Sequence, residues 1–200
     1  MILSQKWGPA NRLVLTLTSD DWIPAGPTCP VGPVVGIDLG LRTGIAVMDD
    51  VGGVGLRLRR YSSTHFANRS ALRRGAPGIL ADVGRQPLVV VEGDVALARV
   101  WERAARLAGG VLVSVPTERW REALLLPRER RSGTDAKRHA GVKARSVIEW
   151  SRRDAGPAGP PPATGELRHD TAEAILIAVW GALQTGRLGA GELPFLLPGR

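Results

Sequence analysis

The sequence predicts an α/β fold, a mixed five-stranded sheet with helices on both faces. Three features support this class: a strand–turn–strand pattern, a third strand of alternating polarity, and then apolar strand runs that alternate with helical patterns. The chain has 200 residues, which is enough to bury a core without disulfide or zinc staples. Its single cysteine, Cys29, excludes an internal disulfide and predicts a reducing, cytoplasmic location.

Three strand patterns come first in the body of the chain. VVGIDLG (Val34–Gly40) and GIAVMDD (Gly44–Asp50) are apolar runs on either side of a short turn, as in a hairpin. GLRLRRYSS (Gly55–Ser63) alternates leucine with arginine, which is typical of a strand with one exposed face. Its arginines are expected either to contact a DNA backbone or to protect a sheet edge; they are Arg57, Arg59 and Arg60.

Helical and strand patterns alternate over the following residues. Residues 65–84 are predicted to be helical, with an interruption at Gly75–Gly78. QPLVVVEG (Gln86–Gly93) and VLVSVP (Val111–Pro116) are typical of buried strands, and the amphipathic helix Val95–Ala108 is predicted between them. The side chains of this helix expected against the sheet are Val100, Trp101 and Leu107.

Two further helical patterns complete the body. DAKRHAGVKARSVIEWSRR (135–153) is basic, and DTAEAILIAVWGAL (Asp170–Leu183) is nearly all apolar, which predicts a buried helix. Stretches rich in proline and glycine lie outside these patterns, and the N-terminal part holds one strand-like run, Leu13–Thr18. The predicted divisions are an N-terminal extension or linker (1–33), a folded body (34–185) and a loosely attached C-terminal tail (186–200).

The charge of the chain indicates a polyanionic partner. The 27 Lys and Arg residues exceed the 19 Asp and Glu residues, so the formal net charge is +8, which favours nucleic acid or an acidic membrane surface over a small neutral ligand. No apolar run approaches the roughly 20 residues needed to cross a bilayer. The basic stretch from Arg119 to Arg153 either neutralises phosphates or is a solvated helix face. Trp120 and Trp150 flank this stretch. Each is expected either to stack on unpaired bases or to pack in the core, and core packing is favoured for Trp150.

Two acids stand at predicted strand ends. Asp38 shares a strand face with Gly36 and Gly40, which leaves the carboxylate open to a ligand and permits close approach of another backbone. The alternative is an acid that begins a hairpin turn. Glu92 ends an apolar strand, at the place where open α/β sheets bind ligands, and the alternative is an ordinary strand-end acid.

Two more acids begin the apolar helix. Asp170 and Glu173 are three residues apart and therefore share one helix face. Helix capping competes as an explanation for Asp170. Capping does not account for Glu173, whose buried carboxylate needs a cationic partner, and no Lys or Arg lies between Asp170 and Thr185. Carboxylate oxygens suit Mg²⁺ or Mn²⁺, and two such ions about 3.5–4 Å apart can bridge a scissile phosphate. The acids therefore predict a metal site for phosphodiester hydrolysis.

At these residues the chain resembles the RuvC-like Holliday-junction resolvases of the RNase H-like superfamily. GIDLGLRTGIAV (Gly36–Val47) is similar to the family's first motif, VVVEG (Val89–Gly93) to its glutamate strand, and HDTAEAILIA (His169–Ala178) to its terminal acidic helix. The matched order extends from Val34 to Leu183. The first motif alone is shared with sugar kinases and actin-like ATPases.

The resemblance implies an RNase H-like sheet and a metal-dependent crossover junction endodeoxyribonuclease that uses Mg²⁺, for which Mn²⁺ can substitute. It also implies a homodimer, because a four-way junction has near-two-fold symmetry and two opposed strands to cut. His169 is expected to neighbour the acids or the helix cap rather than to act in catalysis. By position, the four metal-binding acids and the lysine that enters the junction site are Asp38, Glu92, Asp170, Glu173 and Lys137. The fourth acid is Glu here, where Asp is commoner in the family.

Other functions stay open at this point. An actin-like ATP-binding protein or a sugar kinase needs two such subdomains, and 200 residues supply one. An RNase H-like nuclease that acts on other branched DNA or on RNA hybrids, and a non-catalytic junction-binding protein, are the remaining alternatives. Three further acids are expected to serve turns and helix caps; they are Asp49, Asp50 and Asp94.

Overall fold

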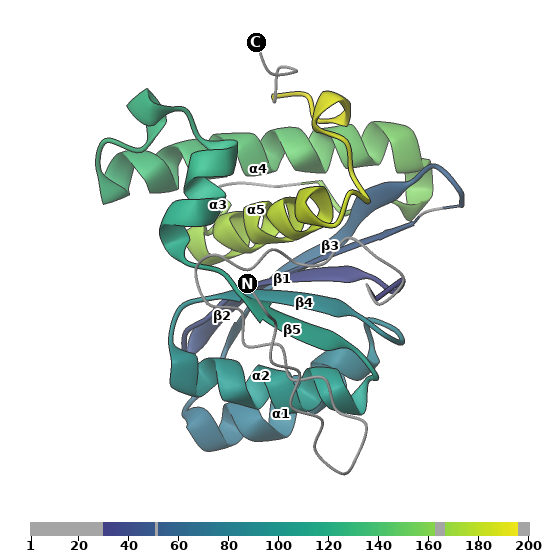
Figure 1. Ribbon diagram of the computed structural model, residues 1–200, viewed down its shortest axis with the longest axis vertical. Coiled ribbons are helices and arrows are strands. Elements are labelled where there is room, and N and C mark those ends of the chain that lie inside the picture. The colour runs from purple at the N-terminus through teal and green to yellow at the C-terminus, as the bar shows by residue number, and fades with distance from the viewer. Residues whose placement is uncertain (1–29, 51, 163–166, 196–200) are drawn as a thin grey trace, which may run out of the picture.

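One mixed sheet forms the middle layer of the protein (Figure 1). The computed structural model describes residues 30–50, 52–162 and 167–195, and within them the strand order is β3-β2-β1-β4-β5. β2 pairs antiparallel with β1 and β3, whereas β4 runs parallel to β1 and β5 runs parallel to β4. The strands are β1 (Val34–Asp38), β2 (Arg42–Asp50), β3 (Leu56–His65), β4 (Leu88–Glu92) and β5 (Val111–Ser114). The predicted architecture, a mixed five-stranded sheet of an α/β fold, is confirmed.

Helices cover both faces of this sheet, as predicted. In Figure 1, α1 and α2 lie on one face and α3, α4 and α5 on the other, with α5 between the sheet and α4. Alternate residues of each strand therefore enter two separate cores: Val35 and Val89 face α1 and α2, whereas Val34 and Val90 face α4 and α5. The helices are α1 (Arg69–Ala81), α2 (Val95–Leu107), α3 (Thr117–Leu124), α4 (Gly133–Ala155) and α5 (His169–Gln184).

Helix α1 runs without the interruption predicted at Gly75–Gly78. Pro77 lies inside it and removes one backbone donor. Leu72, Ala76 and Leu80 are nevertheless fully buried, and their four-residue spacing places them on one helix face. Burial of this stripe outweighs the cost of the local breakers.

Several other expectations about burial were wrong. Leu107 of α2 is 72% exposed, although Trp101 of the same helix is fully buried as expected. β5 is half-buried along part of its length because it is the edge strand of the sheet. Trp120 has no exposed surface, which excludes the stacking on unpaired bases considered for it. Trp150 packs in the core, as favoured.

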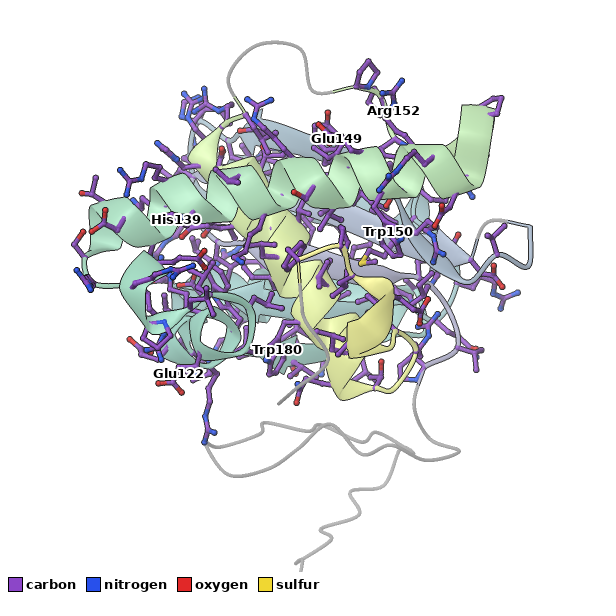
Figure 2. All side chains as sticks on the ribbon, turned by 90° about the horizontal axis from the view of Figure 1, so that it is seen from above. Glu122, His139, Glu149, Trp150, Arg152 and Trp180 are labelled. Atoms are coloured by element: carbon purple, nitrogen blue, oxygen red, sulfur yellow. The ribbon has the colours of Figure 1, made fainter. Side chains whose placement is uncertain are left out.

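Arg57 is a core residue rather than a contact for a DNA backbone. Its guanidinium carbon lies 4.1 Å from the centre of the Trp150 ring, and its Nη2 lies 2.9 Å from Asp154 Oδ2. Figure 2 shows Trp150 and Arg152 on opposite sides of α4. Trp150 is buried and Arg152 is exposed, so α4 has one packed and one solvated side.

The predicted tail begins as part of the core. Leu188 and Leu193 are each 3% exposed, and Lys143 Nζ lies 4.9 Å from the centre of the Phe195 ring. The strand expected at 13–18 and Cys29 lie outside the described residues. Within the described ranges, no helix combines the length and the apolar character needed to span a bilayer.

Glycines let α5 lie directly on the sheet. A Cβ atom at Gly36 of β1 would overlap the carbonyl oxygen of Ala174, and one at Gly44 of β2 would overlap the carbonyl oxygen of Asp170. At the far end of α5, a Cβ atom at Gly181 would lie 2.6 Å from Val90 Cγ2. The spacing between helix and sheet is therefore set by backbone contact at Gly36 and Gly44 and by contact with the Val90 side chain at the far end of α5.

We predict that Gly36→Ala destabilises the protein by about 2–3 kcal/mol, because the added methyl group overlaps the α5 backbone, which has no flexible side chain to move aside. Gly78→Ala is the matched control: nothing lies within 4 Å of its Cβ position, and it should stabilise α1 by about 0.5–1 kcal/mol. Urea unfolding of both variants tests this. Equal stabilities for the two variants would contradict the close-packing account.

Candidate active site

Two acids meet at the ends of neighbouring parallel strands. Asp38 is the last residue of β1 and Glu92 the last residue of β4, and the two are direct register partners. Asp38 lies four residues after Val34, and Glu92 lies two residues after Val90; Val34 and Val90 face α5, so both carboxylates project on the same side of the sheet. The backbone continues this alignment, because Leu39 N donates to the carbonyl oxygen of Glu92 at 2.8 Å.

The first turn of α5 supplies the other two acids. The carbonyl of Asp170 lies against Gly44, and Gly44 is the register partner of Asp38 on β2. Glu173 is 6% exposed, one turn further along the helix. Three elements therefore supply the acids: β1 and β4 supply one each, and α5 supplies two.

Asp38 is electrostatically coupled to the other three acids. Burial has the largest effect, and the nearby charges of Glu173, Glu92 and Asp170 follow in that order; together they raise the pKa of its carboxyl group to about 7. Lys137 acts in the opposite direction and lowers the pKa of Asp38. The other four residues named from the sequence thus lie within electrostatic reach of Asp38. Lys137 is an exposed residue of α4.

Asp170 does not cap its own helix, contrary to the competing explanation. The N-cap residue of α5 is Arg168, and no side-chain hydrogen bond caps the helix. The Asp170 carboxylate instead accepts a hydrogen bond from Ser63 Oγ on β3. Its Oδ1 is buried without a hydrogen-bond partner, although Arg168 Nε lies 3.4 Å away as an ion pair. His169, the first residue of α5, is exposed.

A β-bulge aims Ser63 at Asp170. Val47 of β2 pairs with Arg60 and Met48 with Leu58, so Arg59 is an extra residue on β3. Before the bulge Leu58 enters the core beneath α4, and after it Tyr61 packs against that same core. The extra residue therefore changes the phase of the strand, so that Ser63 projects on the α5 side.

Helix α3 supplies partners for the remaining two acids. Thr117 Oγ1 donates a hydrogen bond to Glu92 Oε1 at 2.7 Å, and Arg121 Nη2 donates one to Glu173 Oε1 at 2.6 Å. Arg121 is the cationic partner that Glu173 requires, and it comes from a distant part of the chain. Sequence reasoning missed both donors because it assigned no helix to these residues. The periodic signal in TERWREAL was short, with only Trp120 and Leu124 buried.

The donor set suits a divalent cation. Carboxylate oxygens are the ligands that Mg²⁺ and Mn²⁺ prefer, and the buried, unbonded Asp170 Oδ1 is an acceptor without a donor. In the described part of the chain, however, no three His, Cys, Asp or Glu side chains are grouped closely enough to hold one ion. Asp170 and Glu173 bond to β3 and α3 respectively, which directs their carboxylates to different neighbours.

The remaining acids and basic residues fall into simpler roles. Asp94 caps α2 by accepting a hydrogen bond from Leu97 N at 2.9 Å, and Asp50 accepts from Gly53 N at 3.1 Å in the turn before β3. Lys143, within the basic segment, is buried and lies 3.3 Å from Glu129. The exposed basic residues of this segment are Arg119, Arg128, Arg130, Arg131, Lys137, Arg138, Arg152 and Arg153.

No protein-family model and no curated protein sequence matches the chain. Among solved structures, the chain is similar to T. thermophilus RuvC in complex with a Holliday junction substrate. The two share 16% sequence identity with a TM-score of 0.47, and the match covers 77% of this chain and 97% of that one.

We predict that Asp38→Asn stabilises the metal-free protein at pH 8 by about 2–4 kcal/mol and leaves its stability nearly unchanged at pH 3.5. The pKa of Asp38 in the folded state is raised to about 7. The unfolded chain therefore ionises first, and the wild type loses stability as pH rises from about 4 to 7. Urea unfolding across this range measures the difference. Asp82→Asn, at the exposed end of α1, is the control. A pH-independent difference would contradict the raised pKa.

The Arg121–Glu173 ion pair should behave as a coupled unit. Glu173 has 7% and Arg121 20% of its side chain exposed. Arg121→Met should cost about 3–5 kcal/mol, because it leaves a buried carboxylate without its partner. The double variant Arg121→Met/Glu173→Gln should cost clearly less than the sum of the two single changes. Urea unfolding of the four proteins gives the coupling energy, and additive effects would show that the pair is energetically unimportant.

Proposed function

We propose that this protein is a Mg²⁺-dependent endonuclease that hydrolyses phosphodiester bonds in branched DNA, with the four-way junction as its substrate. The observation that carries the proposal is the meeting of the ends of β1 and β4 with the first turn of α5, where the charges of Glu92, Asp170 and Glu173 act on Asp38. These acids are far apart in the sequence and belong to three elements. Their gathering costs stability at neutral pH, which favours a role that uses the charge.

The preference for a junction rests on the three sequence motifs described above. A basic chain with a net charge of +8 supports a polyanionic substrate. Recognition of a branch through the geometry of the backbone needs phosphate contacts rather than base contacts. The exposed arginines and lysines of the basic stretch from Arg119 to Arg153 can make such contacts.

The roles of the residues follow from their positions. Asp38, Glu92, Asp170 and Glu173 would hold the divalent cations. When bound, such ions activate a water molecule and stabilise the leaving oxygen of a phosphodiester. Lys137, exposed and close enough to lower the pKa of Asp38, would contact the phosphate beside the acids. Burial of Glu173 and partial burial of the other acids reduce the access of bulk water to their charges.

The direct test is cleavage of a synthetic four-way junction in the presence of Mg²⁺. We predict that Asp38→Asn lowers the single-turnover cleavage rate by about 100-fold or more, since it removes a charged oxygen ligand from the site. The products of the wild type should carry 5′-phosphate and 3′-hydroxyl ends. Asp82→Asn, the same chemical change at the exposed C-cap residue of α1, should cut at the wild-type rate.

Parallel substrates separate the alternatives. Faster cleavage of a flap, a fork or an RNA–DNA hybrid than of the junction would assign a different RNase H-like nuclease activity. Tight junction binding without cleavage under Mg²⁺ or Mn²⁺ would assign a non-catalytic binder. Equal cleavage by the wild type and Asp38→Asn would overturn the proposed site.

A further inference from the structure

Helix α3 reaches two of the four acids from a single face. Thr117 and Arg121 are four residues apart, which places them one above the other on the helix surface. Thr117 bonds to Glu92 at the end of β4, and Arg121 bonds to Glu173 on α5. One short helix therefore contacts acids on two elements that pack against each other.

Burial fixes α3 in place. Trp120 has no exposed surface, and Leu124 is 2% exposed. The Arg121 guanidinium also lies 5.2 Å from the centre of the Trp120 ring. Arg121 Nε is buried without a hydrogen-bond partner, so the side chain reaches Glu173 at the cost of one unsatisfied donor. A helix held this firmly can fix the direction of the side chains that it contacts.

Both bonds are made to one oxygen of the acid, Oε1 in each case. A hydrogen bond to one oxygen restricts rotation of the carboxylate and so sets where its other oxygen points. Carboxylates that ligate metals are commonly held in this way, and loss of the outer partner typically weakens metal binding about 10–100-fold.

We propose that Thr117 and Arg121 are positioning residues that set the orientation of the Glu92 and Glu173 carboxylates for the binding of divalent cations. This inference rests on the proposed function, because it assumes that the two acids bind the metal. Neither residue touches the reacting phosphate in this account; each acts through the acid to which it donates. The role is distinct from the charge that Lys137 brings to the same site.

The experiment measures Mn²⁺ binding to the full chain without DNA, by titration calorimetry and by the electron paramagnetic resonance spectrum of the bound ion. Thr117→Val removes the hydroxyl donor, and Arg121→Lys removes the planar fork. Both changes conserve charge, so a change in affinity reports orientation rather than electrostatic attraction. We expect Thr117→Val to bind Mn²⁺ about 10–100-fold more weakly and Arg121→Lys to weaken binding in the same direction. Thr117→Ser, which keeps the hydroxyl, should restore affinity to within about threefold of wild type.

Two matched controls make the same chemical changes elsewhere. Thr185→Val removes a hydroxyl that donates to Gly181 O at the opposite end of α5. Arg106→Lys alters an arginine of α2, on the other face of the sheet. Both should bind Mn²⁺ as the wild type does.

The outcomes separate this inference from the proposed function. Wild-type affinity in both Thr117→Val and Arg121→Lys, with Asp38→Asn impaired, would leave the metal site standing and assign α3 a structural role only. Thr117→Ser as weak as Thr117→Val would likewise overturn the positioning role. Absence of Mn²⁺ binding by the wild type, or unchanged binding by Asp38→Asn, would overturn the proposed function and this inference together.

Discussion

The close approach of α5 to the sheet is the constraint on which both the fold and the candidate site depend. Gly36 and Gly44 allow the helix backbone to lie against β1 and β2 with no side chain between them. The contact at Gly44 involves the carbonyl of Asp170 itself. The spacing that closes the core therefore also sets how far Asp170 lies from Asp38, the register partner of Gly44. A larger residue at either glycine would displace an acid as well as a helix.

This arrangement gathers negative charge, and the protein offsets part of it with specific donors. Ser63, Thr117 and Arg121 each donate to a different acid, and they come from β3 and α3 rather than from the strands that carry the site. The ionised form of Asp38 is still disfavoured, because burial and three neighbouring carboxylates raise the pKa of its carboxyl group to about 7. The donors thus stabilise the acids without neutralising the site as a whole. A site that keeps this charge imbalance binds a cation more strongly than one in which every acid is paired.

The parts predictable from the sequence are those with a local signal. Runs of apolar residues indicated the strands, and the apolar helix with Asp170 and Glu173 at its start indicated α5. The cationic partner of Glu173 had no such signal, because Arg121 reaches it only through tertiary packing. The capping explanation for Asp170 failed for the same reason: a donor on a distant strand binds its carboxylate.

Two further differences from the prediction have identifiable physical causes. Arg57 alternates with leucines as an exposed residue would, yet stacking on Trp150 and pairing with Asp154 make its burial favourable. The second difference is the β-bulge at Arg59, and the alternation of inward and outward residues in β3 does indicate it. The inward residues are Leu56 and Leu58 before it and Tyr61 after it, so the alternation shifts by one position. Reading that shift would have placed Ser63 on the side of the acids.

Under the proposed function, the charge distribution couples DNA engagement to cation binding. The net charge of +8 attracts a polyanion at long range. Within a Debye length, about 8 Å at physiological salt, the four carboxylates repel a phosphate locally. Lys137 opposes this repulsion near Asp38, Arg121 at Glu173 and Arg168 at Asp170, so that three cations offset part of the charge of the four acids. A phosphate therefore approaches the end of β1 more favourably where divalent cations offset the remaining charge of the acids. A DNA strand bound to the basic stretch from Arg119 to Arg153 is then cut only where the acids hold these cations.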